Sequence, residues 1–302
     1  MKQQNASGYL HSALCGKATA RVMCPACGRN DRDKTFGITA DERGIVGHCF
    51  RCGAVRTEPA ENQWIPSAKR SVAAQTALAA ERAQLHAKAG ERARLIWTRA
   101  QSCVTHPYLT RKGVRADGVR MQRAHANECL SQFFTDAKLM RGSLLLVPLR
   151  DMQWQLHSLQ AIDGKGNKSF LRGARTSGLF HVIGADKLRL ASRNYDRQIA
   201  VCEGYATGWS IVNELDDCPA VVAFTAGNLV HVTRAVFIAF PKARIIVCGD
   251  NDANGVGQAK AIEAASGVGA QYSIPEFTAE QSASGMTDWN HFARCSRVKA
   301  DA

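Results

Sequence analysis

The sequence has no apolar run long enough to cross a lipid bilayer. A membrane-spanning helix needs about 20 consecutive apolar residues, whereas the longest candidate, Ser143 to Leu149, is only of strand length. The N-terminal residues also lack the apolar segment of a secretory signal. We therefore expect a cytoplasmic protein with no membrane partner. With 302 residues, of which 45% are hydrophobic, the chain can form a sizeable core and about two domains.

Acidic residues are scarce relative to basic ones. Asp and Glu number 26 against 39 Lys and Arg, which gives a formal net charge of +13. An excess of this size favours a polyanionic partner, because lysine and arginine release counterions when they bind a phosphate backbone. The charge therefore indicates nucleic acid, and the plainer alternative is a basic protein whose charge only keeps it in solution.

The cysteines do not form a complete disulfide set, because their number, 11, is odd. Four of them stand in two pairs, CPACG with Cys24 and Cys27 and HCFRCG with Cys49 and Cys52, and 21 residues separate the inner two. Two CxxC turns let four thiolates converge on one tetrahedral zinc ion. We therefore predict a structural zinc site and expect His48 to stay outside it. A redox dithiol is the alternative, but it normally uses a single CxxC at the start of a helix.

The zinc ribbon could serve either of two roles: it could stabilise the fold, or it could bind nucleic acid. Its basic side chains are Arg29, Arg32, Lys34 and Arg51. Phe36 and Phe50 are expected to pack in its core rather than to stack on bases. The remaining cysteines are expected to be small buried side chains. They are Cys15, Cys103, Cys129, Cys202, Cys218, Cys248 and Cys295.

The rest of the chain divides by its hydrophobic pattern. A linker with two prolines runs from about Pro59 to Arg70, and residues 71–105 are rich in strong helix formers. LLLVPLR, WQLHSLQAID and NKSFLRG are expected to be strands, with DGKGN as the turn between the last two. After Tyr195 the expected elements alternate: strand IAVCEG, helix ATGWSIVNEL, strand AVVAFTAG, a short helix, strand ARIIVCGD and helix NGVGQAKAIEAAS. This alternation predicts an α/β fold whose parallel sheet is covered on both faces.

Carboxylates stand at the ends of these strands. Glu203 ends IAVCEG, Asp250 and Asp252 end ARIIVCGDND, and Asp288 lies in GMTDWNHF. Ligands of an open parallel sheet bind beyond the carboxyl ends of its strands, so these acids can converge. Carboxylate oxygens suit Mg²⁺ or Mn²⁺, which bind phosphate in turn, and Glu203 is a candidate for proton exchange with the attacking or leaving group. The alternative for each acid is a helix N-cap or a turn.

The run from Ile199 to His291 resembles a Toprim domain, the catalytic fold of bacterial primases, of type IA and type II topoisomerases and of some nucleases. CEGYATG and DND correspond to its motif-one glutamate and motif-two aspartates. The two CxxC motifs resemble the zinc module of replicative primases, with Cys27 where those often carry histidine. Together these features resemble the primases of plasmids, phages and mobile elements. One departure is His291, which stands where related sequences carry an acid.

The resemblance implies an α/β (overall α+β) chain in four parts. These are a template-binding zinc ribbon (1–58), a helical, basic connecting region (59–141), a strand-rich first part of the catalytic core (142–195) and the Toprim domain (196–302). The basic positions that bind nucleotide and template in the family fall on Arg150, Lys168, Arg172, Arg175, Arg111 and Lys112.

The activity implied by the resemblance is that of a DNA primase. Such an enzyme makes short RNA primers from ribonucleoside triphosphates on single-stranded DNA, with Mg²⁺ or Mn²⁺ at the acids and one structural Zn²⁺. A separate helicase or single-stranded-DNA-binding protein is the further partner. The alternatives are a Toprim nuclease and a non-catalytic single-stranded-DNA-binding protein. A topoisomerase is disfavoured, because none of the five tyrosines lies in the separate domain that its chemistry needs.

Overall fold

The computed structural model describes residues 9–15, 18–28, 34–41, 44–59, 72–122, 133–135, 142–186, 188, 194–215 and 218–300. The chain divides into two compact units, Met1–Ala79 and Ala80–Ala302. Almost all of the expected linker lies outside the described residues, as do Arg29 and Arg32. No helix within the described ranges has the length and hydropathy of a membrane span.

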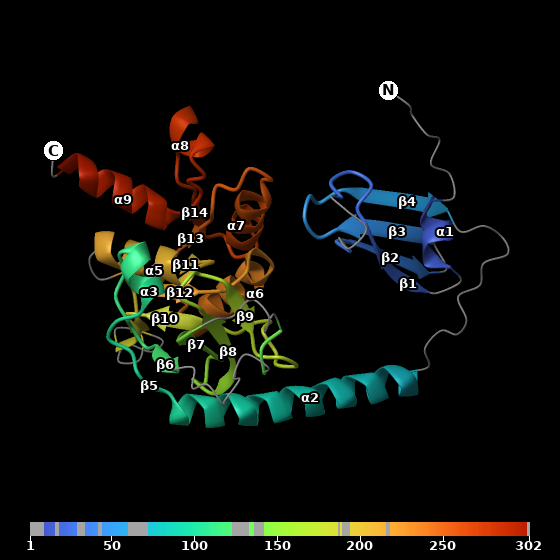
Figure 1. The fold of residues 1–302 in the computed structure, drawn as a ribbon, viewed down its shortest axis with the longest axis horizontal. Helices are drawn as coiled ribbons and strands as arrows, with labels where there is room; N and C mark the ends of the chain where they lie inside the picture. Colours follow the sequence, from blue (N-terminus) through green and yellow to red (C-terminus); the bar gives the residue numbers. More distant parts are fainter. Residues whose placement is uncertain are drawn as a thin grey trace. The chain divides into compact units, whose positions relative to one another are not determined.

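The first unit is a four-stranded antiparallel sheet with a short helix, α1 (Tyr9–Leu14), against it (Figure 1). Its strands pair in sequence order and are β1 (Thr19–Val22), β2 (Phe36–Asp41), β3 (Gly44–Cys49) and β4 (Val55–Pro59). Leu10 of α1 is buried in one cluster with Phe36 and Ile45 of the sheet. Cys24 and Cys49 join the same cluster. Two of the predicted zinc ligands are therefore part of the unit's core.

The two phenylalanines of the ribbon differ in their surroundings. Phe36 is fully buried, as predicted, but Phe50 is 63% exposed, so the prediction of core packing is wrong for Phe50. The reason is its place in the turn after β3, where its ring lies over Gly37. The guanidinium carbon of Arg21 lies 4.6 Å from the ring centroid, and the His48 ring lies 5.1 Å from it.

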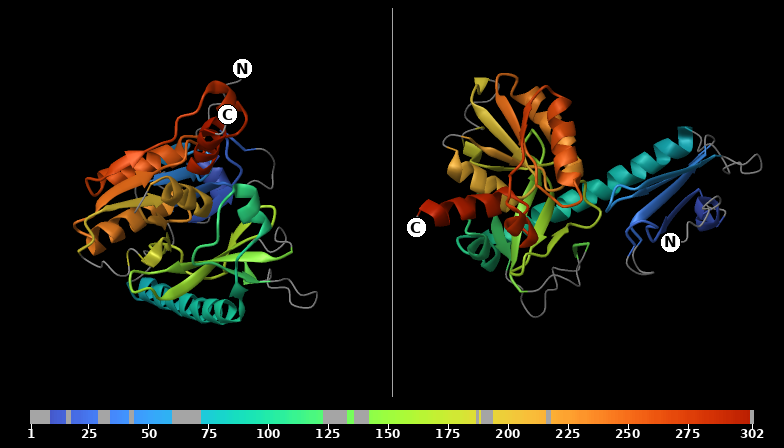
Figure 2. Two further views of the ribbon diagram at one scale, coloured as in Figure 1. Left: turned by 90° about the vertical axis from the view of Figure 1, so that its left-hand side faces the viewer. Right: turned by 90° about the horizontal axis from the view of Figure 1, so that it is seen from above.

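The second unit contains an antiparallel sheet, and the part of the long helix α2 (Val72–Arg99) that belongs to this unit lies along one face of the sheet (Figures 1 and 2). The strands pair in sequence order and are β5 (Gln101–Ser102), β6 (Arg120–Gln122), β7 (Leu144–Arg150), β8 (Leu156–Ile162) and β9 (Lys168–Phe170). Ala93 and Ile96 of α2 are buried against Leu144, Leu146 and Leu159. A short helix, α3 (Pro107–Lys112), connects β5 to β6.

The same unit contains a mixed sheet in the order β10-β12-β11-β13-β14, in which only β10 runs antiparallel to its neighbour. Its strands are β10 (His181–Ile183), β11 (Gln198–Cys202), β12 (Ala220–Val222), β13 (Arg244–Cys248) and β14 (Gln271–Ser273). The helices are α5 (Tyr205–Glu214), α6 (Ala226–Ala239), α7 (Val256–Ser266), α8 (Ala279–Ala283) and α9 (Trp289–Ala300).

Alternation along β11 explains how helices cover both faces of this sheet. Ala200 and Cys202 lie in one cluster with α5 and with Val147 of β7, whereas Ile199 and Val201 lie in another with α6 and α7. The two sheets of the unit therefore share a core through the α5 side. The predicted α/β class, with a zinc ribbon and a parallel sheet, is confirmed.

The predicted strands and helices appear where the patterns placed them, but some bounds differ and some short strands were not predicted. The helix expected to reach residue 105 ends at Arg99, because Gln101 and Ser102 pair with β6. The strand in AVVAFTAG ends at Val222, since Phe224 turns the chain with a φ of 71°, and the helix expected to be short has 14 residues. β10 and β14, each of three residues, gave no periodic signal.

Most of the scattered cysteines are buried, as predicted. The buried ones are Cys103, Cys202, Cys218 and Cys248. Cys15 is exposed, because it follows the last turn of α1, and Cys295 on α9 is half-buried. Cys129 lies outside the described residues.

Candidate active site and zinc centre

Two of the predicted acids leave the parallel sheet at the same edge. β11 and β13 are neighbours, and Cys202 at the end of β11 pairs in register with Cys248 at the end of β13. Glu203 follows β11 directly, and Asp250 follows β13 after one glycine. The chain therefore brings both carboxylates to the carboxyl end of the sheet, where open α/β folds bind ligands.

The DND loop is tied to the segment that carries the fourth acid. The Asn251 N–H donates to the Thr287 carbonyl at 2.6 Å, directly before Asp288. Gln258 donates through Nε2 to Asn251 Oδ1 at 2.6 Å and to the Asp252 carbonyl at 3.1 Å. Asn251, Thr287 and Gln258 were not among the predicted site residues. The only signal for them was the polar residue between the two aspartates.

Glycines let helix α7 approach this loop. A Cβ on Gly257 would stand 2.6 Å from the Asp250 carbonyl oxygen and 3.1 Å from Asp252 Oδ2. A Cβ on Gly249 would stand 2.6 Å from the Cβ of Ala261. Distances this short are not tolerated, so the position of both carboxylates depends on the missing side chains.

The acids destabilise one another's charged forms. Burial raises the pKa of Asp250 to about 8, and the charges of Glu203, Asp288 and Asp252 add to the rise, while Lys168 opposes it. Burial also raises the pKa of Glu203, where Lys168 lowers it and Asp252 raises it. The pKa of Asp252 is raised by burial and then by Asp288. A divalent cation would relieve this repulsion.

The donor set fits a hard cation. Asp250 Oδ1 is buried without a hydrogen-bond partner, which is costly for a carboxylate oxygen unless a cation lies beside it. Among the described residues, no three of the acids bring one oxygen each within 4.8 Å of one another. Direct ligands of one Mg²⁺, each about 2.1 Å from the ion, lie within about 4.2 Å of one another. Glu203, Asp250 and Asp252 are the residues that would hold such an ion, whose charge would offset their repulsion.

Asp288 also has a structural role. Its Oδ1 accepts the His291 N–H at 2.8 Å and so caps the first turn of α9. Its Oδ2 lies 3.4 Å from Lys112 Nζ. His291 accepts the Thr287 N–H on Nδ1 at 3.2 Å, and burial lowers its pKa, so the ring supports the loop as a neutral group. With both oxygens engaged, Asp288 is the least available of the four acids.

The structure brings two of the predicted basic residues to the acids. Lys112 pairs with Asp288. Lys168 Nζ lies 4.0 Å from the point where a Cβ on Gly204 would stand, and its charge lowers the pKa of Glu203. These two ammonium groups lie where a phosphate chain bound at the acids would need cations.

Arg150 lies at the other end of the antiparallel sheet. Leu145 of β7 and Lys168 of β9 both pair with Ile162 of β8, and Arg150 stands five residues beyond Leu145. At about 3.4 Å per residue, that separates the rows of Arg150 and Lys168 by roughly 17 Å. Arg150 therefore does not belong to the acidic edge.

The remaining predicted basic residues have separate surroundings. Arg111 donates to the carbonyl of Gly164 in the turn between β8 and β9. Arg172 is exposed and donates to the Phe134 carbonyl at 3.2 Å. Arg175 is half-buried. None of these three has an interaction with the acids among the contacts of the described residues.

The four predicted zinc ligands form a cluster in the first unit. The Sγ atoms of Cys24, Cys27, Cys49 and Cys52 all lie within 4.8 Å of one another, with Cys24–Cys52 at 3.8 Å and Cys27–Cys49 at 3.6 Å. Four sulfurs at about 2.3 Å from a tetrahedral Zn²⁺ are about 3.8 Å apart, so the cluster fits zinc. Burial alone would raise the pKa of Cys49, but hydrogen bonds from the backbone N–H groups of Cys52 and Arg51 lower it to about 6. The lower pKa favours the thiolate.

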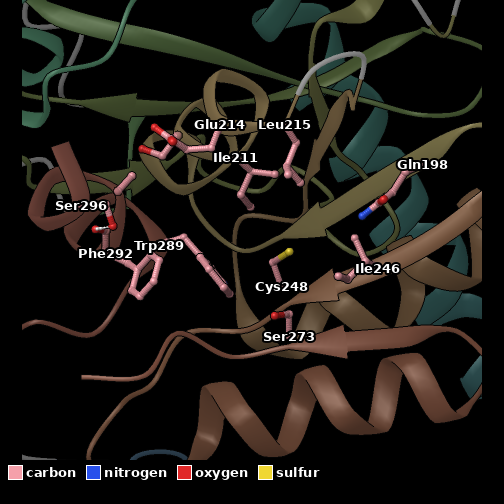
Figure 3. A pocket seen from close by; sticks show the side chains of 12 residues that line it. Gln198, Ile211, Glu214, Leu215, Ile246, Cys248, Ser273, Trp289, Phe292 and Ser296 are labelled. Atoms are coloured by element: carbon pink, nitrogen blue, oxygen red, sulfur yellow. Dashed lines mark hydrogen bonds between the residues drawn. The ribbon is translucent and has the colours of Figure 1, made fainter. Parts of the chain in front are cut away.

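An apolar cavity of about 390 Å³ lies between α5, α9 and β13. Figure 3 shows Trp289 and Phe292 of α9 on one side of it and Ile246 and Cys248 of β13 on the other. Glu214 is the only acid in its lining. The cavity is therefore distinct from the acidic edge, although two of its residues are close to Asp250 and Asp288 in sequence.

Comparison with known proteins supports the prediction of a Toprim domain in the part of the chain that carries the acids. Residues 198–296 match the family model for the Toprim domain. The chain is 30% identical over 259 residues to a DNA primase TraC of Escherichia coli, a match that covers 82% of this chain and 22% of that protein. A second protein of that name and organism is 29% identical over 180 residues, 57% of this chain and 11% of that protein. The chain thus matches only about a fifth and a tenth of these relatives' lengths.

Several solved structures of primases resemble this chain, but with low TM-scores. The primase fragment of the bacteriophage T7 primase-helicase protein has a TM-score of 0.42 at 13% identity, covering 92% of this chain and 96% of that one. The Aquifex aeolicus primase, with its zinc-binding and RNA polymerase domains, has a TM-score of 0.40 at 12% identity, covering 84% and 72%. Scores this low add no argument about function. The Toprim prediction itself is confirmed by the family match, and all four acids lie inside the matched residues.

Proposed function

We propose that this chain is a DNA primase that makes short RNA primers from ribonucleoside triphosphates on single-stranded DNA. The observation that carries the proposal is the acidic edge of the Toprim domain, where burial and mutual repulsion raise the pKa values of Glu203 and Asp250 beside the cation of Lys168. Such an edge gains most from a divalent cation and a polyphosphate bound together. The similarity to two proteins named DNA primase supports the proposal.

In this proposal the groups at the edge share three tasks. Glu203, Asp250 and Asp252 hold Mg²⁺ or Mn²⁺, which when bound neutralises charge on the reacting phosphates. Glu203 takes the proton from the attacking 3′-hydroxyl, a role that suits a buried carboxylate with a raised pKa. Lys168 and Lys112 orient the phosphates as point charges.

The zinc ribbon would hold the template. Exposed Phe50 offers a ring for a base, and Arg21 and Arg51 stand beside it or in the same turn. We assign residues 1–58 to template binding, 59–141 to a connecting region, 142–195 to the strand-rich part of the core and 196–302 to catalysis. Arg111, Arg172 and Arg175 would contact nucleic acid along the core. We further propose that the protein acts in the cytoplasm with a separate helicase or single-stranded-DNA-binding protein.

The test is a primer-synthesis assay with the full chain. Single-stranded DNA, labelled ribonucleotides and Mg²⁺ or Mn²⁺ are incubated with wild type, Glu203→Gln and Asp250→Asn. We expect metal-dependent oligoribonucleotides from wild type, reduced at least about 100-fold in both variants, as is typical for the loss of a group that stabilises the transition state. Glu263→Gln, an exposed carboxylate on α7, is the matched control and should retain activity.

Each of the other outcomes would indicate a different function or a different active site for this chain. Metal-dependent degradation of the template, lost in the same two variants, would show a Toprim nuclease. Template binding with neither product would show a non-catalytic DNA-binding protein. Primer synthesis that survives both substitutions would place the chemistry elsewhere in the molecule.

A further inference from the structure

A second cavity of about 390 Å³ lies in the unit Ala80–Ala302, at the end of β7 beside the edge strand β10. Arg150 lines it, and the row of Arg150 is separated from that of Lys168 by roughly the 17 Å that five strand residues span. Its lining joins cationic, acidic and aromatic side chains. That combination is absent from the apolar cavity between α5 and α9.

The cationic wall consists of two arginines on one indole ring. The guanidinium carbons of Arg120 and Arg150 lie 4.8 Å and 5.7 Å from the Trp97 ring. Arg120 donates through Nη1 to the Trp97 carbonyl at 2.6 Å, and Arg150 donates through Nη1 to the Trp154 carbonyl at 2.9 Å. Both arginines line the cavity. Two guanidinium groups close together match the oxygens of a phosphate with their fork geometry.

The acidic wall holds two carboxylates. Asp117 accepts the Gly184 N–H on Oδ2 at 2.9 Å. Burial raises the pKa of Asp117, and the nearby charge of Asp186 adds to the rise. A pair of neighbouring carboxylates of this kind is stabilised by hydroxyl donors, and adjacent sugar hydroxyls supply two.

This wall is formed before any ligand binds. The Tyr205 hydroxyl accepts the Asp117 N–H at 2.7 Å and donates to the Arg115 carbonyl at 2.9 Å. His181 is buried, burial lowers its pKa to about 4, and its neutral ring donates through Nε2 to the Asp117 carbonyl at 3.0 Å. Gly118 has a φ of 63°, and a Cβ there would stand 2.9 Å from His181 Cε1. A preformed wall lowers the entropic cost of binding.

An aromatic side chain at the cavity is held in a strained backbone conformation. Trp154 has a φ of 62°, which is rare for a bulky residue. Its N–H donates to the Asp151 carbonyl at 2.9 Å, and its ring lies edge to face with Phe180 at 6.3 Å. The hairpin turn therefore fixes an indole at the lining of the cavity, where a base can stack on it.

We propose that this cavity binds a 5′-phosphorylated ribonucleoside. The phosphate lies between Arg120 and Arg150, the ribose hydroxyls face Asp117 and Asp186, and the base packs on Trp154. A free ribonucleotide and the 5′ end of an RNA strand present this same chemistry. Binding here needs neither the acidic edge nor a divalent cation, so the site is independent of the proposed catalytic function.

The test measures nucleotide binding by the full chain that carries Asp250→Asn, with no divalent ion added. GTP and dGTP are titrated by calorimetry. We expect GTP to bind at least about fivefold more tightly than dGTP, because the 2′-hydroxyl is lost from a carboxylate partner. Arg120→Lys and Arg150→Lys keep the charge but lose the fork, and each should weaken GTP binding about tenfold or more.

Two further variants complete the design. Asp117→Asn should remove the preference for GTP over dGTP, whereas Lys260→Gln, which changes a half-buried cation on α7 that pairs with Glu263, should leave both affinities unchanged. A short RNA carrying a 5′-phosphate distinguishes the sources, since tighter binding than GTP identifies a primer end and weaker binding identifies a free nucleotide.

The proposal is overturned if the Asp250→Asn chain, whose cavity residues are unchanged, does not bind GTP at millimolar GTP concentrations. It is also overturned if both arginine variants bind GTP as tightly as their parent. Thermal unfolding of each variant distinguishes a structural role of the arginines from a role in binding. If the arginines only hold α2 in place, their replacement would lower the unfolding temperature and leave the affinity for GTP unchanged. A failure of primer synthesis does not affect this test, since the parent chain already lacks the Asp250 carboxylate.

Discussion

Replacing Asp250 with asparagine is expected to stabilise the metal-free protein at neutral pH while it removes activity. Asp250 is a buried carboxyl group whose Oδ1 has no hydrogen-bond partner, beside three other acids. Its charge is useful only when a cation is bound. Without the cation, the charged form works against folding, and asparagine has the same shape without the charge.

The magnitude follows from the pKa. The folded protein raises the pKa of Asp250 from 3.8 to about 8. A carboxyl group with a higher pKa in the folded than in the unfolded protein destabilises the fold, and the loss grows as pH rises from about 4 and is complete above about 8. At about 1.4 kcal/mol per pKa unit, the penalty is on the order of 2 kcal/mol at pH 5 and on the order of 4 kcal/mol at pH 7.

The assay is urea unfolding followed by tryptophan fluorescence, without added divalent ions, near pH 5 and near pH 7. Four of the five tryptophans, Trp97, Trp154, Trp209 and Trp289, lie in the unit Ala80–Ala302, so most of the signal reports that unit. Asp250→Asn should raise the unfolding midpoint, more at the higher pH, and Mg²⁺ should narrow the difference by stabilising wild type alone.

The matched control is Asp151→Asn, which should act in the opposite direction. Burial alone would raise the pKa of Asp151, but His157 and two backbone N–H donors lower it, so its charge stabilises the fold near neutral pH. A lower midpoint for Asp250→Asn at pH 7, or an equal gain at both pH values, would refute the account of a strained metal ligand.

Three other predictions follow from single contacts. Gly257→Ala should displace the DND loop and reduce primer synthesis about tenfold or more, because its Cβ would meet the Asp250 carbonyl at 2.6 Å; Gly227→Ala, with open space at its Cβ, should leave activity intact. Removal of zinc by a chelator, or Cys49→Ser, should unfold the first unit while the second keeps its unfolding midpoint, as circular dichroism and limited proteolysis would show; equal loss in both units would contradict a local staple. Lys112→Met should tighten Mn²⁺ binding a few-fold by removing the cation 3.4 Å from Asp288 and should weaken triphosphate binding, and an unchanged affinity for both would remove Lys112 from the site.

The sequence predicted the acidic edge because its signal is local. Glu203 and Asp250 each follow a short apolar strand, and parallel neighbours end at one edge by the geometry of the sheet. The cysteine pairs were equally local, since two turns determine which four sulfurs meet. In both cases a spacing of a few residues carried the information.

The basic residues were harder to place, because their partners are far away in the chain. A lysine or arginine stem reaches several ångströms, and the pairing register of β7 and β8 decides which end of the sheet it serves. Arg150 and Lys168 look alike in sequence, yet only Lys168 lies with the acids. The acidic wall of the second cavity could not be predicted for the same reason. Asp117 contacts Gly184 and Tyr205, which are 67 and 88 residues away in the sequence.

The short helix α3 shows how such long-range contacts can serve the proposed reaction. His106 caps its start by accepting the Tyr108 N–H at 3.2 Å, and Gly113 ends it with a φ of 66°. Asn290 donates to the Lys112 carbonyl at 2.9 Å, so the last turn is fastened to α9 independently of the lysine side chain. The Lys112 ammonium can therefore leave Asp288 for a bound phosphate while its backbone stays in place. A cation held in this way is ready for the substrate at little entropic cost, and until then it offsets part of the repulsion among the acids.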